Sequence, residues 1–249
     1  KTDGSSPFDL VLSHSGDNFA VMGMHFKIGL YEHQSAGGLQ GLIDLVRKNA
    51  GLLEPGAISK VVVKAYEPAF GIIGDPAKRD PHTRQSADHS MVYIVATLLR
   101  KAIERRDQVA NQDSDDVWKA LMLMPEDYSQ DALMNPATRE LMAKITFAYG
   151  GPEYDAKYPD GIPTSVEIEA DSKTFDSGLV MYPAGHARNA TASLAGLLAR
   201  KFELLGKIGL PDGQDVAPLL GKLGNLSEMS AEEVSTIYDF EIAERLGYE

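Results

Sequence analysis

Apolar residues recur at helical spacing in several stretches of the chain, which predicts amphipathic helices there. The clearest series follows residue 90 and places one stripe of a helix against a core: Val92, Val95, Leu99 and Ala102. Similar patterns predict further helices over residues 35–49, 117–124, 136–144, 191–205 and 232–246. Asn135 and Pro136 suit the N-cap and the first helical position of one of these helices.

Alternating polarity, or a run of β-branched and aromatic residues, predicts β-strands elsewhere. The predicted strands cover residues 19–30, 58–66, 145–149, 164–170 and 173–182. Apolar residues alternate with glutamates over residues 164–170, so we expect a sheet with one covered face and one wet face. The pair Asp171-Ser172 predicts a hairpin turn, and the Gly, Pro and Asp content of residues 150–163 predicts a loop.

Composition and charge restrict the class of protein. The chain has 249 residues, of which 43% are hydrophobic and 24% charged, and no apolar run is long enough to span a membrane. The net charge of -12 argues against nucleic-acid binding, because phosphate backbones need a basic surface. Residues 78–106 nevertheless carry seven Lys/Arg against three Asp/Glu. This basic island predicts a small anionic ligand.

The chain contains no cysteine. Disulfides, a thiolate nucleophile and an iron–sulfur cluster held by cysteines of this chain are therefore excluded. This composition is compatible with a reducing compartment, and we expect the cytoplasm or, in a eukaryote, the mitochondrial matrix. The first residue is Lys1, no targeting pattern follows it, and residues 1–18 are interpreted as a linker at the start of a fragment.

A basic loop containing Arg79 and Arg84 leads into the predicted helix after residue 90. His89 and Tyr93 lie four residues apart, which places them on a shared face if both are helical. The helix dipole disfavours an imidazolium in the first turn, so His89 would stay neutral and able to accept a proton. A packed structural pair is the alternative explanation of this spacing.

Two strand-to-helix corners carry further reactive side chains. Lys27, Glu32 and His33 surround the first corner, where the alternative is a set of solvated or helix-capping side chains. His186 and Arg188 precede the second, where free backbone N–H groups favour an anion. An ordinary capped connection explains the second corner equally well.

Three motifs, taken together, resemble one known family. They are D-P-H-T-R-Q-S-A-D-H-S-M-V-Y over residues 80–93, M-Y-P-A-G-H-A-R-N over residues 181–189 and H-F-K-I-G-L-Y-E-H-Q-S-A over residues 25–36. The sequence resembles the MmgE/PrpD family, that is, the 2-methylcitrate dehydratases and their relatives.

The resemblance implies an α+β fold, the lid domain of a protein whose larger domain is all-helical. It assigns residues 19–183 to the lid and residues 184–249 to C-terminal helices that return to the helical domain. Relatives are close to twice as long, so we expect this chain to lack most of the helical domain and to be inactive alone. We also expect a homodimer.

The resemblance further implies the loss of water from a small tricarboxylate without metal or cofactor. It places Tyr93, Lys27 and His33 in the site, and the spacing argument adds His89. Four residues are candidates for binding the carboxylates of the substrate: Arg79, Arg84, His186 and Arg188. Relatives often place more residues between the lysine and the histidine, so Glu32 is an alternative occupant of the position given to His33.

Two other functions stay open from the sequence. A relative of the same fold could decarboxylate cis-aconitate or epimerise a similar small acid, and turnover assays separate these activities. The chain could instead be a non-catalytic binding or assembly module whose acidic C-terminal helices dock a partner.

Overall fold

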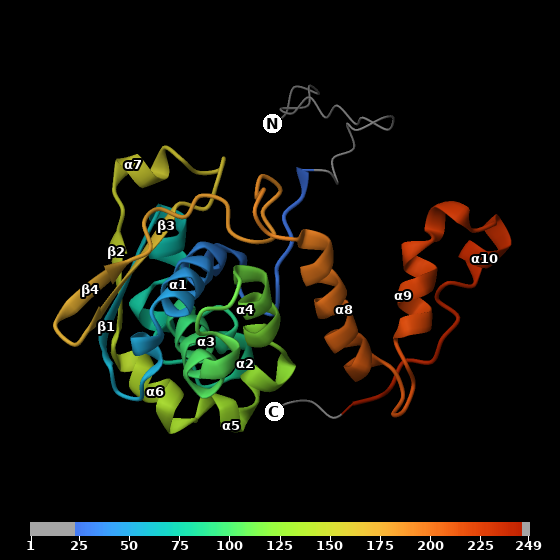
Figure 1. The fold of residues 1–249 in the computed structure, drawn as a ribbon, viewed down its shortest axis with the longest axis horizontal. Coiled ribbons are helices and arrows are strands. Elements are labelled where there is room, and N and C mark those ends of the chain that lie inside the picture. The colour runs from blue at the N-terminus through green and yellow to red at the C-terminus, as the bar shows by residue number, and fades with distance from the viewer. Residues whose placement is uncertain (1–22, 246–249) are drawn as a thin grey trace, which may run out of the picture.

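The structure of the protein is a computed structural model that describes residues 23–245. The linker predicted over residues 1–18 and the start of the strand predicted over residues 19–30 lie outside the described residues. The described part has a mixed α+β fold, which confirms the predicted α+β class, whereas its assignment to a lid domain stays a prediction (Figure 1). The predicted domain boundary after residue 183 stays a prediction.

Residues 23–31 form an irregular segment, so the strand predicted there is wrong for the described part. The backbone of this segment bonds to two separate loops instead of to a neighbouring strand. Phe26 N–H donates to Gly185 O at 2.8 Å, and Leu30 N–H donates to Leu123 O at 2.9 Å. Local composition could not reveal these two distant acceptors.

A four-stranded mixed sheet, in the order β2-β1-β3-β4, forms one side of the fold (Figure 1). Its strands are β1 (Ile58–Ala65), β2 (Ile145–Tyr149), β3 (Thr164–Ala170) and β4 (Lys173–Asp176). β1 is parallel to β2 and antiparallel to β3, and β3 and β4 form a hairpin. Asp171 and Ser172 have φ angles of 48° and 60°, as a tight hairpin turn requires, which confirms the predicted turn.

The sheet has one covered and one wet face, as predicted. Val61 of β1 is paired with Ile168 of β3, and both side chains are fully buried. On the opposite face, Lys60 Nζ lies 2.9 Å from Glu169 Oε1 in an exposed ion pair. Exposed pairs of this kind contribute at most about 1 kcal/mol, so apolar burial on the covered face is the larger stabilising term.

The last strand is shorter than the predicted stretch of residues 173–182, because β4 ends at Asp176. The Ser177 hydroxyl there accepts the hydrogen bond of Val166 N–H at 2.9 Å. Gly178 follows with a φ angle of 68° and interrupts the strand, and the chain pairs with β3 once more where Val180 N–H donates to Thr164 O at 2.8 Å.

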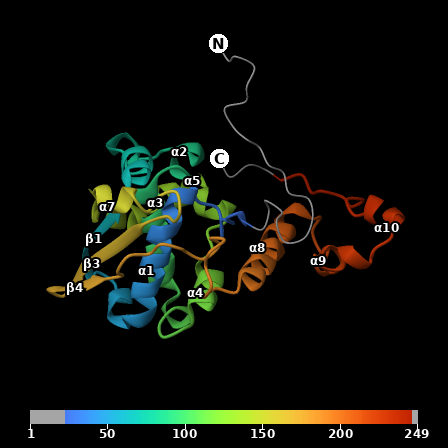
Figure 2. The same ribbon diagram turned by 90° about the horizontal axis from the view of Figure 1, so that it is seen from above.

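Two helices, α1 (Ala36–Lys48) and α3 (Met91–Glu104), contact the sheet, and Figure 2 shows α1 alongside the strands. The α1 backbone approaches β3 closely, since a Cβ at Gly37 would lie 2.6 Å from Thr164 Oγ1. Every residue from Met91 to Leu99 is buried. The α3 helix is therefore covered on all sides in its first half, and the predicted stripe was only part of its buried surface.

Shorter helices complete the body of the fold: α2 (Arg84–Ala87), α4 (Ser114–Leu121), α5 (Gln130–Leu133), α6 (Pro136–Ala143) and α7 (Pro152–Asp155). Asn135 Oδ1 accepts hydrogen bonds from Ala137 N–H and Thr138 N–H, which confirms the predicted N-cap of α6. The helix α7 lies within the stretch that was predicted to be a loop, with Pro152 in its first turn.

The C-terminal helices α8 (Leu194–Gly209), α9 (Ala217–Gly224) and α10 (Ala231–Ser235) extend away from the sheet (Figures 1 and 2). The α8 helix packs on α4 and buries Leu197 completely. Across residues 23–245, each helix is too short or too polar to span a bilayer.

The long helix predicted over residues 232–246 is wrong, because α10 ends at Ser235. The Ser235 hydroxyl donates to the Glu232 carbonyl at 2.6 Å and competes for an acceptor that another helical turn would use. The chain then returns to the end of α8, where Ala243 N–H donates to Gly209 O at 2.8 Å.

Candidate functional site

A pocket of about 280 Å³ lies between the segment of residues 27–33 and the turn that precedes α3. Its lining residues are Lys27, Leu30, Tyr31, Glu32, His33, Arg84, Asp88, His89 and Tyr128. The structure thus brings together four residues predicted from the sequence, since Lys27, His33, Arg84 and His89 all line this pocket. Glu32, the alternative to His33, lines it as well.

The segment that forms one wall of the pocket is held by hydrogen bonds on both sides. Ile28 N–H donates to the Tyr31 hydroxyl at 2.9 Å within the segment. Two residues outside the segment bond to Leu30. Its N–H donates to Leu123 O, and its carbonyl accepts a hydrogen bond from the Tyr128 hydroxyl. These bonds fix the backbone on which Lys27, Glu32 and His33 are carried.

Glu32 and His33 have shifted proton affinities. Burial raises the pKa of Glu32, opposed by the Gln34 N–H bond to its carboxylate and by the positive charges of His89, Lys27 and Lys78. Burial also lowers the pKa of His33, assisted by repulsion from His25 and Lys27. His33 is therefore neutral near pH 7 and able to accept a proton.

His89 lies outside α3, because Ser90 is the N-cap and the helix begins at Met91. The prediction that His89 and Tyr93 share a helix face is therefore wrong. His89 Nδ1 instead donates a hydrogen bond to the adjacent Asp88 carboxylate, so this nitrogen carries a proton. The His89 side chain is 60% exposed, so a ligand in the pocket can reach it.

Tyr93 is fully buried and does not line the pocket. Its hydroxyl donates to the Asp127 carbonyl at 2.5 Å, and burial raises its pKa, so the proton is retained. The Tyr93 ring lies 5.8 Å from the ring of Tyr128, which does line the pocket. Tyr93 thus supports the pocket from behind.

The remaining predicted cations lie elsewhere. The Arg79 guanidinium donates to Gly74 O and stacks on the Phe147 ring, 5.4 Å from its centroid. Arg188 pairs with Asp160 beside a second, larger hollow of about 980 Å³. These two arginines are bound to protein groups, which gives each a structural partner.

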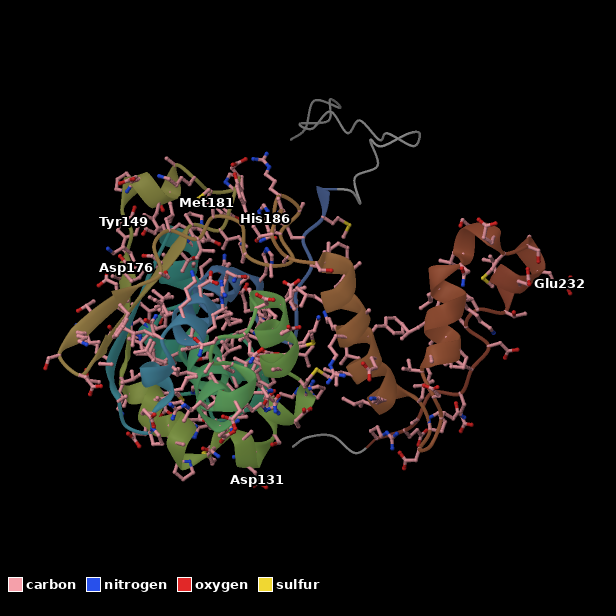
Figure 3. The ribbon with its side chains drawn as sticks, viewed as in Figure 1. Asp131, Tyr149, Asp176, Met181, His186 and Glu232 are labelled. Carbon is pink, nitrogen blue, oxygen red and sulfur yellow. The ribbon has the colours of Figure 1, made fainter. Side chains whose placement is uncertain are left out.

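His186 is buried, 4% exposed, and it does not precede a helix directly, because α8 begins at Leu194. The expectation of an anion held at a helix start beside His186 and Arg188 is therefore wrong in its geometry. Figure 3 labels His186 on the loop that leads to α8. Its imidazole stacks on the His25 ring at 3.9 Å between centroids.

Residues 32–216 match the sequence profile of the MmgE/PrpD C-terminal domain. The chain belongs to the MmgE/PrpD family. The match includes His33, Arg84 and His89 of the pocket, whereas Lys27 precedes it. A search of curated proteins finds no match to this chain. The family includes hydro-lyases.

Several pocket residues of this MmgE/PrpD domain were not predicted. Tyr128 follows the acidic pair Glu126 and Asp127 in a segment without periodicity, so no sequence signal marked it. Asp88 was not predicted either, although it is adjacent to His89. Ser90 carried a usable signal, because a serine before a long apolar run is a favoured N-cap and would have excluded His89 from the helix.

Within residues 23–245, no three His, Asp or Glu side chains are arranged to hold a metal ion. The polar groups of the pocket are instead two cationic side chains, two imidazoles, two carboxylates and tyrosine hydroxyls. Such a set can bind carboxylates and exchange protons.

Proposed function

We propose that this chain provides the lid-side wall of an active site that eliminates water from 2-methylcitrate to give 2-methyl-cis-aconitate. One observation carries the proposal: the pocket places the cations Lys27 and Arg84 beside the imidazoles of His33 and His89. Membership in a family that includes hydro-lyases supports the same chemistry.

Elimination of water needs three kinds of group. A base removes a proton from the carbon next to a carboxylate, an acid protonates the departing hydroxyl, and cations stabilise the negative charge that develops. The electron pair of the broken C–H bond forms the carbon–carbon double bond as the C–O bond breaks. One water molecule leaves, so the proton balance closes without an oxidant or reductant.

The pocket residues fit these three roles. His33 is the proposed base, because its lowered pKa keeps the ring neutral. His89 is the proposed acid in its imidazolium form, in which Nδ1–H donates to Asp88 and Nε2–H carries the proton that the departing hydroxyl takes. Lys27 and Arg84 are the proposed partners of the substrate carboxylates.

Glu32 is the alternative base in this proposal. A second carboxylate repels an anionic substrate unless it is protonated or paired, and burial raises its pKa. Lys27 acts in the opposite direction and favours the ionised form of Glu32. The variants His33→Gln and Glu32→Gln distinguish the two bases, since only the true base gives a collapse of kcat.

We propose that an all-helical domain completes the site opposite the pocket, and that the assembled enzyme is a homodimer. The profile that matches this chain describes a C-terminal domain, which is consistent with a further domain in the family. The C-terminal segment also presents exposed apolar side chains, Tyr238 at 81% and Ile242 at 71%, that a partner could cover.

Turnover tests the proposal in the complete enzyme that contains this domain. We expect 2-methylcitrate dehydration, with His33→Gln lowering kcat by about 100-fold or more and His82→Gln, at an exposed histidine outside the pocket, leaving it unchanged. The 249-residue chain alone should be inactive. Carbon dioxide release or epimerisation in place of dehydration would identify a different family activity, and an unchanged kcat in His33→Gln would contradict the assigned base.

A further inference from the structure

Three histidines form a stack, two of them from residues 25–33 and one from the loop before α8. The His25 ring lies 3.9 Å from the His186 ring and 5.8 Å from the His33 ring, with interplanar angles of 23° and 6°. Parallel rings do not point their nitrogen lone pairs at a common centre, so this arrangement is not suited to a metal ion. It joins the segment that carries Lys27 to the loop before α8.

Backbone donors determine where the imidazole protons lie. Ala187 N–H donates to His25 Nδ1 at 3.0 Å, and Arg188 N–H donates to His186 Nδ1 at 3.1 Å. Each Nδ1 must therefore carry a lone pair, which places the single proton of each neutral ring on Nε2. Adding a proton to either Nδ1 would break its bond to the backbone.

The backbones of Gly185 and Phe26 lie in close contact. Gly185 has a φ angle of 89°, and a Cβ there would overlap the carbonyl oxygen of Phe26. Phe26 N–H donates to Gly185 O at 2.8 Å, and Lys201 Nζ donates to the carbonyl of Lys27 at 2.8 Å. The backbone that carries the Lys27 side chain is therefore hydrogen-bonded both at Phe26 and at Lys27 itself.

We propose that His25 and His186 are positioning residues for Lys27, which form a clip that is closed while the His186 imidazole is neutral and opens when it is protonated. The inference rests on the proposed function, since Lys27 matters only if the pocket binds an anion. An open clip frees residues 25–28 and removes one cation from the pocket wall. The site would then lose affinity for its substrate in acid.

The charges around the clip set the direction of its pH response. Burial lowers the pKa of His186 to about 4, assisted by repulsion from His25, His33 and Arg188 and opposed by Asp160. The Tyr182 ring also faces His186, at 4.9 Å between ring centroids. His33 also faces Lys27, which further disfavours a cation in the stack. The clip is therefore closed near neutral pH.

The expected size of the response follows from linkage. A freed histidine has a pKa of about 6.5, whereas the clipped His186 has a pKa of about 4. The open state then binds the proton more tightly, and its population rises about 30-fold between about pH 7.5 and about pH 5.

Hydrogen exchange at the amides of Phe26, Ala187 and Arg188 measures this opening without any ligand. After correction for intrinsic exchange rates, we expect about 30-fold less protection at the lower pH. Nitrogen NMR at the higher pH should show the Nε2–H form of both His25 and His186. Protection that does not change with pH, or an Nδ1–H form of either ring, would overturn the inference.

The variant His186→Asn provides the decisive comparison, because Asn Oδ1 can replace Nδ1 as the acceptor for Arg188 N–H and does not titrate. We expect its protection to be nearly independent of pH, whereas His82→Asn, at an exposed histidine paired with Asp80, keeps the wild-type response. An unchanged pH response in His186→Asn would overturn the inference. If that variant does not fold, nitrogen NMR of His186 in the wild type tests the same point, because protonation of its Nδ1 should coincide with the loss of protection, and protonation without that loss would overturn the inference.

The inference and the proposed function fail separately. A clip that does not titrate contradicts the inference even if citrate binds in the pocket at neutral pH. Citrate that does not bind at neutral pH, while the clip titrates as described, contradicts the proposed function and with it the role of the clip in positioning Lys27.

Discussion

The Tyr128 hydroxyl donates a hydrogen bond to the carbonyl oxygen of Leu30, which lies 98 residues earlier in the chain. This bond ties the loop after α4 to the segment that carries Lys27, Glu32 and His33. Both residues also line the pocket, so the bond holds two of its walls at a fixed separation.

Removal of this hydroxyl should loosen the pocket wall. We expect Tyr128→Phe to lower the free energy of unfolding by about 0.5–1.5 kcal/mol, because the partly buried Leu30 carbonyl loses a donor. Tricarboxylate affinity should fall as well. Urea unfolding and calorimetric titration measure the two effects, with Tyr149→Phe as a control at an exposed tyrosine bonded to Asp155. Wild-type affinity in Tyr128→Phe would show that the bond does not shape the pocket.

Tyr93 should behave as a structural residue in the enzyme. Its hydroxyl is engaged by the Asp127 carbonyl and its ring is fully buried. We expect Tyr93→Phe to lower the free energy of unfolding by about 0.5–1.5 kcal/mol and to leave kcat within a few-fold of the wild type. A loss of kcat on the order of 100-fold at unchanged stability would return Tyr93 to the catalytic group that the family resemblance implied.

The buried pair Lys101 and Asp127 should be a strong local determinant of stability. Lys101 Nζ donates to Asp127 Oδ2 at 2.5 Å and to Met122 O at 2.9 Å, and both charged side chains are less than 10% exposed. Without Lys101, the buried Asp127 carboxylate loses its close partner and keeps the more distant Arg100 at 3.9 Å, so Lys101→Met should cost about 3 kcal/mol.

A double-mutant cycle with Asp127→Asn tests the pair by urea unfolding. The double variant should be less destabilised than the sum of the two single variants, because neither charge is then left alone. Additive effects would mean that Lys101 and Asp127 act independently.

Replacing each of two glycines that have similar φ angles distinguishes the cost of backbone strain from the cost of a steric overlap. Gly185 and Gly213 have φ angles of 89° and 82°, so replacement by alanine strains the backbone at both by about 1–3 kcal/mol. At Gly185 the added Cβ would also overlap the Phe26 carbonyl, whereas nothing lies within 4 Å of a Cβ at Gly213. Gly185→Ala should therefore lower the melting temperature clearly more than Gly213→Ala. Equal effects would mean that the 185–188 turn does not contact Phe26 closely.

Elements with local signals were predictable from the sequence. The strands β1, β2 and β3 and the helix α1 follow from their own polarity patterns, and the hairpin and the Asn135 cap follow from residues within a few positions of each turn. The predicted helix over residues 232–246 failed because side-chain competition at Ser235 and the return to Gly209 outweigh a periodic apolar pattern.

Only some of the residues that line the candidate site were predictable from the sequence. Lys27, His33, Arg84 and His89 were found because reactive side chains stood near strand ends and helix starts. Tyr128 was missed, because its role depends on contacts with residues about 100 positions away.

The histidine stack could not be predicted from the sequence for a similar reason. It joins His25 and His186 across 161 positions, and no periodic pattern records such a pairing. Both features are products of tertiary packing.

Calorimetric titration of the 249-residue chain with citrate and 2-methylcitrate measures whether the pocket lined by Lys27 and Arg84 binds a tricarboxylate. We expect saturable binding near neutral pH that weakens at least about 10-fold in Arg84→Gln, since a charged hydrogen-bond partner is lost. Arg106→Gln, at an arginine paired with Glu54 outside the pocket, should bind as the wild type does. No binding, or equal affinity in the wild type and Arg84→Gln, would show that this pocket is not a tricarboxylate site.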